Sequence, residues 1–150
     1  MDAEAFDHPG LGRFEHDIAD EVWVAPWSDG ARAFDIAVLG SEDDQGPPPA
    51  GLLRLEAAVG RLERLMAKGL EAIRAARVAR LGWSEGPGDD AWTVLALVSD
   101  GDAGLWLVAI EPQTDEYSSW WAGFDAKNAV TEVRRGAAGS SYDPHSARVV

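Results

Sequence analysis

Apolar and polar residues alternate with a two-residue period in three segments near the start of the chain: 11–18, 21–27 and 32–40. This period is typical of strands, because successive side chains of a strand point to opposite faces. In the third segment, Phe34, Ile36 and Val38 share one face. The SDG sequence at 28–30 favours a hairpin turn before that segment. We therefore expect an antiparallel meander of three strands.

A period of three to four residues replaces this alternation between about residues 50 and 80 and predicts one long amphipathic helix. A loop with three consecutive prolines, 41–51, precedes it and cannot continue a sheet. Gly60 and Gly69 lie inside the helical pattern, where each glycine costs about 1 kcal/mol relative to alanine. We expect a bend or break near Gly69.

Four further segments read as strands joined by connections short enough for hairpins: 91–98, 104–110, 116–124 and 128–135. A helix must bury its apolar stripe, and a sheet is the one large apolar surface on offer. The sequence therefore predicts an α+β fold, with a curved, mostly antiparallel sheet of three N-terminal and four C-terminal strands and the helix packed on it. Residues 1–150 form one domain in this prediction, with loose tails at 1–10 and 136–150.

Both faces of the central C-terminal strands are apolar, and one helix cannot cover both. Leu105 and Leu107 fall on one face of their strand, while Trp106 and Val108 fall on the other. The second face needs a cover, either the N-terminal meander, a second copy of the chain or a partner protein. We favour the first, which packs Trp121 internally.

The chain is acidic, with a formal net charge of −13. Such a surface repels nucleic acid and anionic lipid and attracts basic proteins, or it serves only to keep the protein in solution. The helical segment 50–81 is the exception, because it holds seven basic and three acidic residues. We interpret its basic face as solvated and paired with the acidic loops of the same chain.

Residue types that carry common chemistries are sparse. The chain has no cysteine, which excludes disulfides and thiolate ligands, and the motifs of serine hydrolases and phosphate-binding loops are absent. His16 beside Asp17 is the best candidate for a general base. We expect no catalytic, metal or cofactor site. The start of the chain lacks a signal sequence and no apolar run spans a bilayer, so we expect a cytoplasmic protein without membrane contacts.

Three features together carry a family resemblance: LGRFEHD near the start, an amphipathic helix after a proline-rich loop, and the final hairpin WWAGFDAKNAVTEVRR. In this layout, over roughly residues 10–135, the chain resembles small bacterial domains, some of which are immunity proteins of polymorphic toxin systems. The resemblance implies a cytoplasmic protein that binds one partner. It transfers no functional residue.

Two classes of function remain open. The first is a non-enzymatic acidic binding protein, an immunity or antitoxin protein that occludes a basic toxin. Its candidate contacts are acidic turn residues and two aromatic residues: Glu42, Asp43, Asp44, Asp89, Asp90, Tyr117 and Trp121. The second is a small-ligand-binding domain or enzyme with a pocket under the sheet. A structural homodimer joined through the sheet is a further alternative, so the chain is expected to be a monomer or a homodimer.

Overall fold

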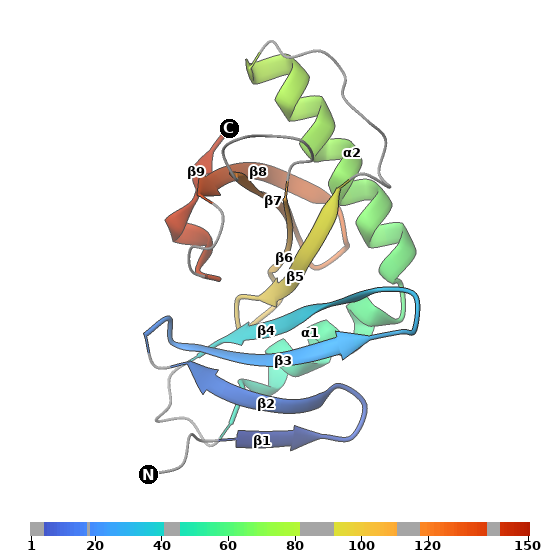
Figure 1. Ribbon diagram of the computed structural model, residues 1–150, viewed down its shortest axis with the longest axis vertical. Coiled ribbons are helices and arrows are strands. Elements are labelled where there is room, and N and C mark those ends of the chain that lie inside the picture. Colours follow the sequence, from blue (N-terminus) through green and yellow to red (C-terminus); the bar gives the residue numbers. More distant parts are fainter. Residues whose placement is uncertain (1–4, 18, 41–45, 82–91, 111–117, 138–141) are drawn as a thin grey trace.

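The computed structural model describes residues 5–17, 19–40, 46–81, 92–110, 118–137 and 142–150. Within them, nine strands form one open sheet, and two helices run along one of its faces (Figure 1). The order of the strands in the sheet follows their order in the chain. The predicted α+β class and the mostly antiparallel sheet are confirmed.

The N-terminal part contributes four strands: β1 Ala5–His8, β2 Gly12–Asp17, β3 Val22–Ser28 and β4 Ala33–Leu39. The last three match the predicted meander, whereas β1 lies in a segment for which we expected a loose tail. It pairs with β2 and places Phe6 opposite Phe14. The β1–β2 turn is held by His8, whose Nδ1 accepts hydrogen bonds from the backbone N–H groups of Gly10 and Leu11. β1 was not predicted because a strand of four residues is too short to show a clear alternation of apolar and polar residues.

Two helices replace the single helix that we predicted: α1 Pro49–Val59 and α2 Leu62–Leu81. The break lies at Gly60, and the expectation of a break near Gly69 is wrong. Gly69 is inside α2, where a Cβ atom would lie 2.6 Å from Leu107 Cδ2. Glycine at this position lets α2 approach the sheet closely, so its role is packing.

The C-terminal part supplies five strands: β5 Thr93–Ser99, β6 Leu105–Ile110, β7 Ser118–Phe124, β8 Val130–Ala137 and β9 Arg148–Val149. A 3₁₀ turn at Pro144–Ser146 precedes β9. This turn and β9 lie in the second segment for which we expected a loose tail. The β4–β5 pair is parallel and all other neighbouring strands are antiparallel.

The main core lies on the face of the sheet that α1 and α2 cover, called here the helix face. Buried side chains of the sheet, among them Trp23, Ile36 and Trp120, form one cluster with Leu55 of α1 and Ile73 of α2. Alternation along each strand brings these residues to the same face. The apolar residues of the helices and those on one side of the strands therefore form a single core.

The opposite face, called here the inner face, is also buried. Its cluster consists of Val22, Ala37, Ala96, Val98, Trp106, Val108, Trp121 and Ala147, with Tyr142 packed against it. The sheet curls, and the C-terminal segment with the 3₁₀ turn reaches back from β9 toward β4 (Figure 1), where Tyr142 bonds to Asp35. We favoured the N-terminal meander as the cover, and it contributes Val22 and Ala37, but the C-terminal segment contributes Ala147 and Tyr142 as well. Trp121 is 1% exposed and makes an edge contact with Trp106.

Candidate functional site

A groove of about 640 Å³ opens on the inner face beside the C-terminal segment. It is called here the acidic groove and is lined by Glu15, His16, Asp17, Ala19, Val24, Pro26, Asp35 and Tyr142. Three of these residues are carboxylates, and none of these described residues is a lysine or arginine. The groove is therefore a local concentration of negative charge within an acidic protein.

Strand register explains why the carboxylates share this face. Glu15 of β2 stands opposite Val24 of β3, and Pro26 of β3 stands opposite Asp35 of β4. Directly opposed residues on neighbouring strands point to the same side of the sheet. Glu15 and Asp35 consequently flank β3 on the inner face.

Tyr142 closes one side of the acidic groove. Its hydroxyl group donates a hydrogen bond to Asp35 Oδ2 over 2.5 Å. Burial of the phenol, and then its hydrogen bond to the Asp35 carboxylate, raise the pKa of Tyr142 well above its ordinary value. The hydroxyl therefore remains a donor at neutral pH and holds the C-terminal segment against β4.

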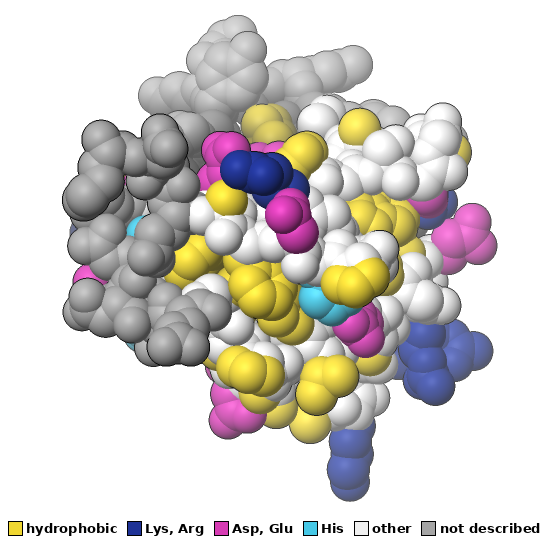
Figure 2. Space-filling model, turned by 90° about the horizontal axis from the view of Figure 1, so that it is seen from below, with side chains coloured by type: hydrophobic (Ala, Val, Ile, Leu, Met, Phe, Trp, Pro, Cys, Tyr) yellow, Lys and Arg dark blue, Asp and Glu magenta, His cyan; other side chains and the backbone are white. Residues whose placement is uncertain are grey.

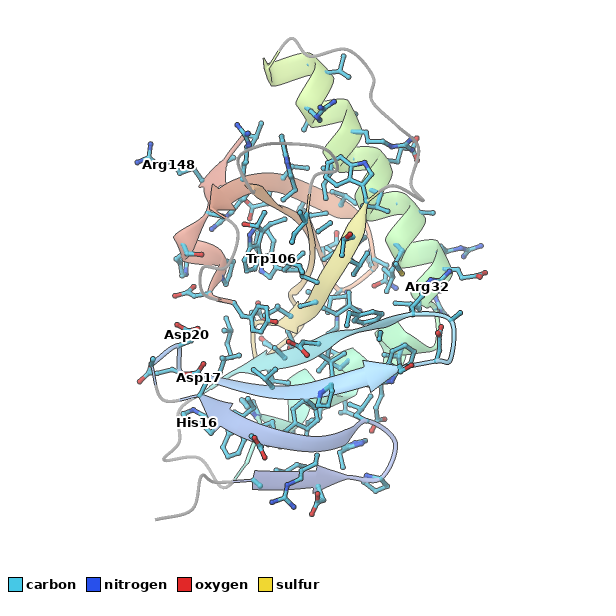
Figure 3. All side chains as sticks on the ribbon, viewed as in Figure 1. His16, Asp17, Asp20, Arg32, Trp106 and Arg148 are labelled. Carbon is cyan, nitrogen blue, oxygen red and sulfur yellow. The ribbon has the colours of Figure 1, made fainter. Side chains whose placement is uncertain are left out.

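The other two carboxylates are only weakly neutralised. Asp17 Oδ1 accepts a hydrogen bond from the Ala19 N–H group at 3.0 Å, and this neutral donor brings no positive charge to the carboxylate. Glu15 Oε1 lies 3.9 Å from Arg13 Nε, and both side chains are mostly exposed. An exposed ion pair of this kind is screened by solvent. Asp17 and Asp20 lie at the same end of the sheet, beside the β2–β3 turn (Figure 3).

His16 and Asp17, the candidate general base and its neighbour, do not converge. His16 is 8% exposed, lies against Trp23 on the helix face and bonds through Nε2 to the Gly40 carbonyl oxygen at 3.0 Å. A carbonyl oxygen only accepts, so Nε2 carries the proton. Asp17 points to the inner face, because neighbouring residues of a strand alternate. The pair therefore forms no acid–base dyad.

Of the other contact residues named from the sequence, only Trp121 falls within the described part of the chain. It is buried in the inner-face cluster and offers no surface to a partner. The remaining six lie outside the described residues: Glu42, Asp43, Asp44, Asp89, Asp90 and Tyr117. Glu15, Asp35 and Tyr142 were not predicted as site residues from the sequence. Asp35 could have been predicted as a site residue, because it is a charged residue within an otherwise apolar strand.

The end of the molecule formed by β1 and α1 presents a second surface. Figure 2 shows hydrophobic side chains gathered there with acidic and basic side chains between them. Leu53 of α1 is 66% exposed, and a shallow cavity beside it is lined by residues of both charges, including Arg54, Glu56 and Asp102. The mixed charge distinguishes this surface from the acidic groove.

Among the described residues, no three His, Asp or Glu side chains stand close enough together to hold a metal ion. None of the described helices combines the length and the apolar character needed to cross a membrane.

Comparison with protein-family models, with curated proteins and with solved structures found no significant match. The function therefore has to be argued from the geometry and charge of the chain itself.

Proposed function

We propose that this chain is a non-enzymatic acidic binding protein of the cytoplasm, an immunity or antitoxin protein that occludes a basic toxin. The observation that carries the proposal is the acidic groove, in which Glu15, Asp17 and Asp35 face one space of about 640 Å³. A space of this size admits one or two long basic side chains of a partner.

Electrostatics favour a basic partner over other classes of ligand. The net charge of −13 steers a positively charged protein toward the chain and raises its association rate. Within the groove, a lysine or arginine side chain would form charge-assisted hydrogen bonds with the carboxylates, which are about twice as strong as neutral ones. Steering and docking thus act in the same direction.

The acidic residues predicted from the sequence remain candidate contacts in the proposal, although they lie outside the described residues. The charges of Glu42, Asp43, Asp44, Asp89 and Asp90 would accelerate encounter with a basic partner, and Tyr117 stays a candidate aromatic contact. Trp121 has no place in the contact surface, because its side chain is buried. Its role is to support the inner face beneath the partner.

A pair of matched charge variants tests the proposal. A tagged chain is used as bait in lysate of its native cell at low and moderate salt, and the retained basic proteins are identified by mass spectrometry. The double variant Glu15→Lys/Asp17→Lys should lower the association rate of the retained partner at least tenfold, by roughly the size of electrostatic steering. Co-expression of the wild-type chain should protect a host cell from that partner.

The control is Glu71→Lys/Asp102→Lys, which changes the net charge by the same amount at two exposed residues away from the groove. It should retain the partner nearly as well as the wild type. Equal loss in both variants would show that total charge alone acts, and no loss in either would remove the groove from the binding surface.

A further inference from the structure

A basic cavity lies on the other side of the molecule, where α1 ends, α2 begins and the β3–β4 turn meets them. It measures about 620 Å³ and is lined by Arg32, Arg61, Arg64, Trp27, Asp29 and Glu63, among others. It is called here the arginine corner. Its volume lies within the range of small-molecule sites. Three guanidinium groups against two carboxylates give it a positive charge, opposite to that of the whole chain.

The arginines of this corner are poorly neutralised. Arg32 lies 3.7 Å from Asp29 Oδ2 and 3.5 Å from Glu63 Oε1, and the Glu63 side chain is 86% exposed. Within the described part of the chain, the guanidinium groups of Arg61 and Arg64 have neither an ion pair nor a hydrogen bond. Acidic residues outnumber basic ones twofold, 26 to 13, so partners for these cations are plentiful in the sequence. Their lack of partners leaves them available to an anion.

The first turn of α2 adds backbone donors to the same cavity. The hydrogen-bond ladder of the helix starts where the Leu65 N–H group donates to the Arg61 carbonyl oxygen at 3.1 Å. The N–H groups of Leu62, Glu63 and Arg64 precede that bond and therefore have no acceptor within the helix. They stand at the positive end of the helix dipole, which favours phosphate.

Trp27 supplies a planar surface beside the cations. Its side chain is partly buried and lies on Phe34, with ring centroids 5.3 Å apart and an angle of 37° between the ring planes. A tryptophan held in this way is a platform on which a nucleobase or similar ring can stack. Cations and an aromatic ring in one cavity are the two elements that a phosphorylated aromatic ligand requires.

A second cavity next to the arginine corner lies where β4 and β5 separate. β4 and β5 pair over only four residues, from Asp35 opposite Ala96 to Val38 opposite Ser99. Before that ladder the strands diverge under α2 around a cavity of about 530 Å³, which shares Arg32 and Glu63 with the arginine corner. Its wall includes Phe34 and Trp92. A ligand ring therefore has apolar room beyond Trp27.

We propose that the arginine corner binds a small phosphorylated compound with a planar ring, of the nucleoside monophosphate class. The phosphate is held by Arg32, Arg61, Arg64 and the first turn of α2, and the ring stacks on Trp27. A polynucleotide is disfavoured, because its many phosphates meet the negative field of the whole chain. This activity is independent of the proposed partner binding, because the acidic groove lies on the inner face.

Calorimetric titration of the full chain with adenosine and guanosine 5′-monophosphates tests the site. Each nucleotide should bind at least about tenfold more tightly than ribose 5-phosphate or the free nucleoside, since each of those lacks one of the two recognised parts. Arg61→Gln/Arg64→Gln should weaken nucleotide binding about tenfold or more. Trp27→Leu should lower the affinity for the nucleotide and leave the affinity for ribose 5-phosphate unchanged.

The matched control is Arg148→Gln in β9, an exposed arginine on the opposite side of the molecule from Arg32 (Figure 3). It should bind nucleotide as the wild type does. Arg61 and Arg64 are exposed, so their replacement should leave the circular dichroism spectrum unchanged. No saturable binding up to about 10 mM nucleotide would overturn the proposal. Inorganic phosphate binding as tightly as the nucleotide, or an oligonucleotide binding more tightly, would overturn it too.

Discussion

At the scale of single residues, Tyr142 links the C-terminal segment to β4 through its hydrogen bond to Asp35. The variant Tyr142→Phe keeps the ring and removes the hydroxyl group. We expect the free energy of unfolding at neutral pH to fall by about 1.5–3 kcal/mol, the size of a hydrogen bond to a charged acceptor. Urea denaturation followed by circular dichroism measures the difference.

The same bond predicts a dependence on alkaline pH. Because the pKa of Tyr142 is raised in the folded state, its contribution to stability is complete below the unfolded pKa of about 10 and is lost as the pH rises above it. The gap between the wild type and Tyr142→Phe should therefore narrow above about pH 10. Stability curves that stay parallel through that range would show that Tyr142 ionises equally in both states.

Single residues also show where sequence reasoning stops. The alternation around Trp121 places its side chain on one face, but whether that face meets solvent depends on Tyr142 and Ala147 from the C-terminal segment. His16 and Asp17 are neighbours in the chain and point to opposite faces. For this reason, residues that are adjacent in the sequence of a strand do not form a common site. Residues that do share a face, such as Pro26 and Asp35, can be identified only when the pairing register of the strands is known.

At the scale of elements, two glycines of the helical region should respond oppositely to alanine. At Gly69 the new methyl group would lie 2.6 Å from Leu107 and 3.2 Å from Phe124, both buried. Overpacking of this kind costs about 1–3 kcal/mol, which outweighs the helix propensity gained. At Gly60 the nearest atoms are 3.6 Å away and φ is −71°, which alanine adopts readily.

We therefore expect Gly69→Ala to lower the melting temperature and Gly60→Ala to raise it slightly, by up to about 1 kcal/mol in stability. Differential scanning calorimetry of both variants checks the pair. A Gly69→Ala variant as stable as the wild type, or more stable, would contradict the close approach of α2 to β6 and β7.

These two glycines show which part of the helical region could be predicted from the sequence. The apolar period predicted the helical region, but it carries no information on which glycine ends a helix. That choice depends on the surroundings, since Gly60 is exposed and Gly69 faces the sheet. β1 and β9 escaped prediction for a related reason, because strands of four and two residues are defined by the neighbour they pair with.

At the scale of the whole molecule, the inner face depends on the C-terminal segment. Ending the chain after Ala137 removes the Tyr142 bond to Asp35, the Arg134 bond to the Pro144 carbonyl oxygen and the cover of Ala147. We expect the free energy of unfolding to fall by about 2–4 kcal/mol. Tryptophan fluorescence should shift to longer wavelength, because Trp106 and Trp121 become exposed to water.

Denaturation, fluorescence and light scattering of the shortened chain measure these effects. The control Val149→Ala removes an exposed side chain of β9 and should change none of them. A shortened chain with unchanged fluorescence would show that the curl of the sheet alone protects the two tryptophans.

The four-residue ladder between β4 and β5 also governs how the molecule assembles. Every other pair among the described strands joins segments that are close in the chain, whereas β4 and β5 are separated by residues 40–92, which include both helices. Closing so long a segment costs more chain entropy than closing a hairpin. We therefore expect each half of the sheet to form locally and the pairing of β4 with β5 to be the slow step of folding. A molecule bound in the cavities beside the joint would delay its opening and lengthen the lifetime of the folded chain.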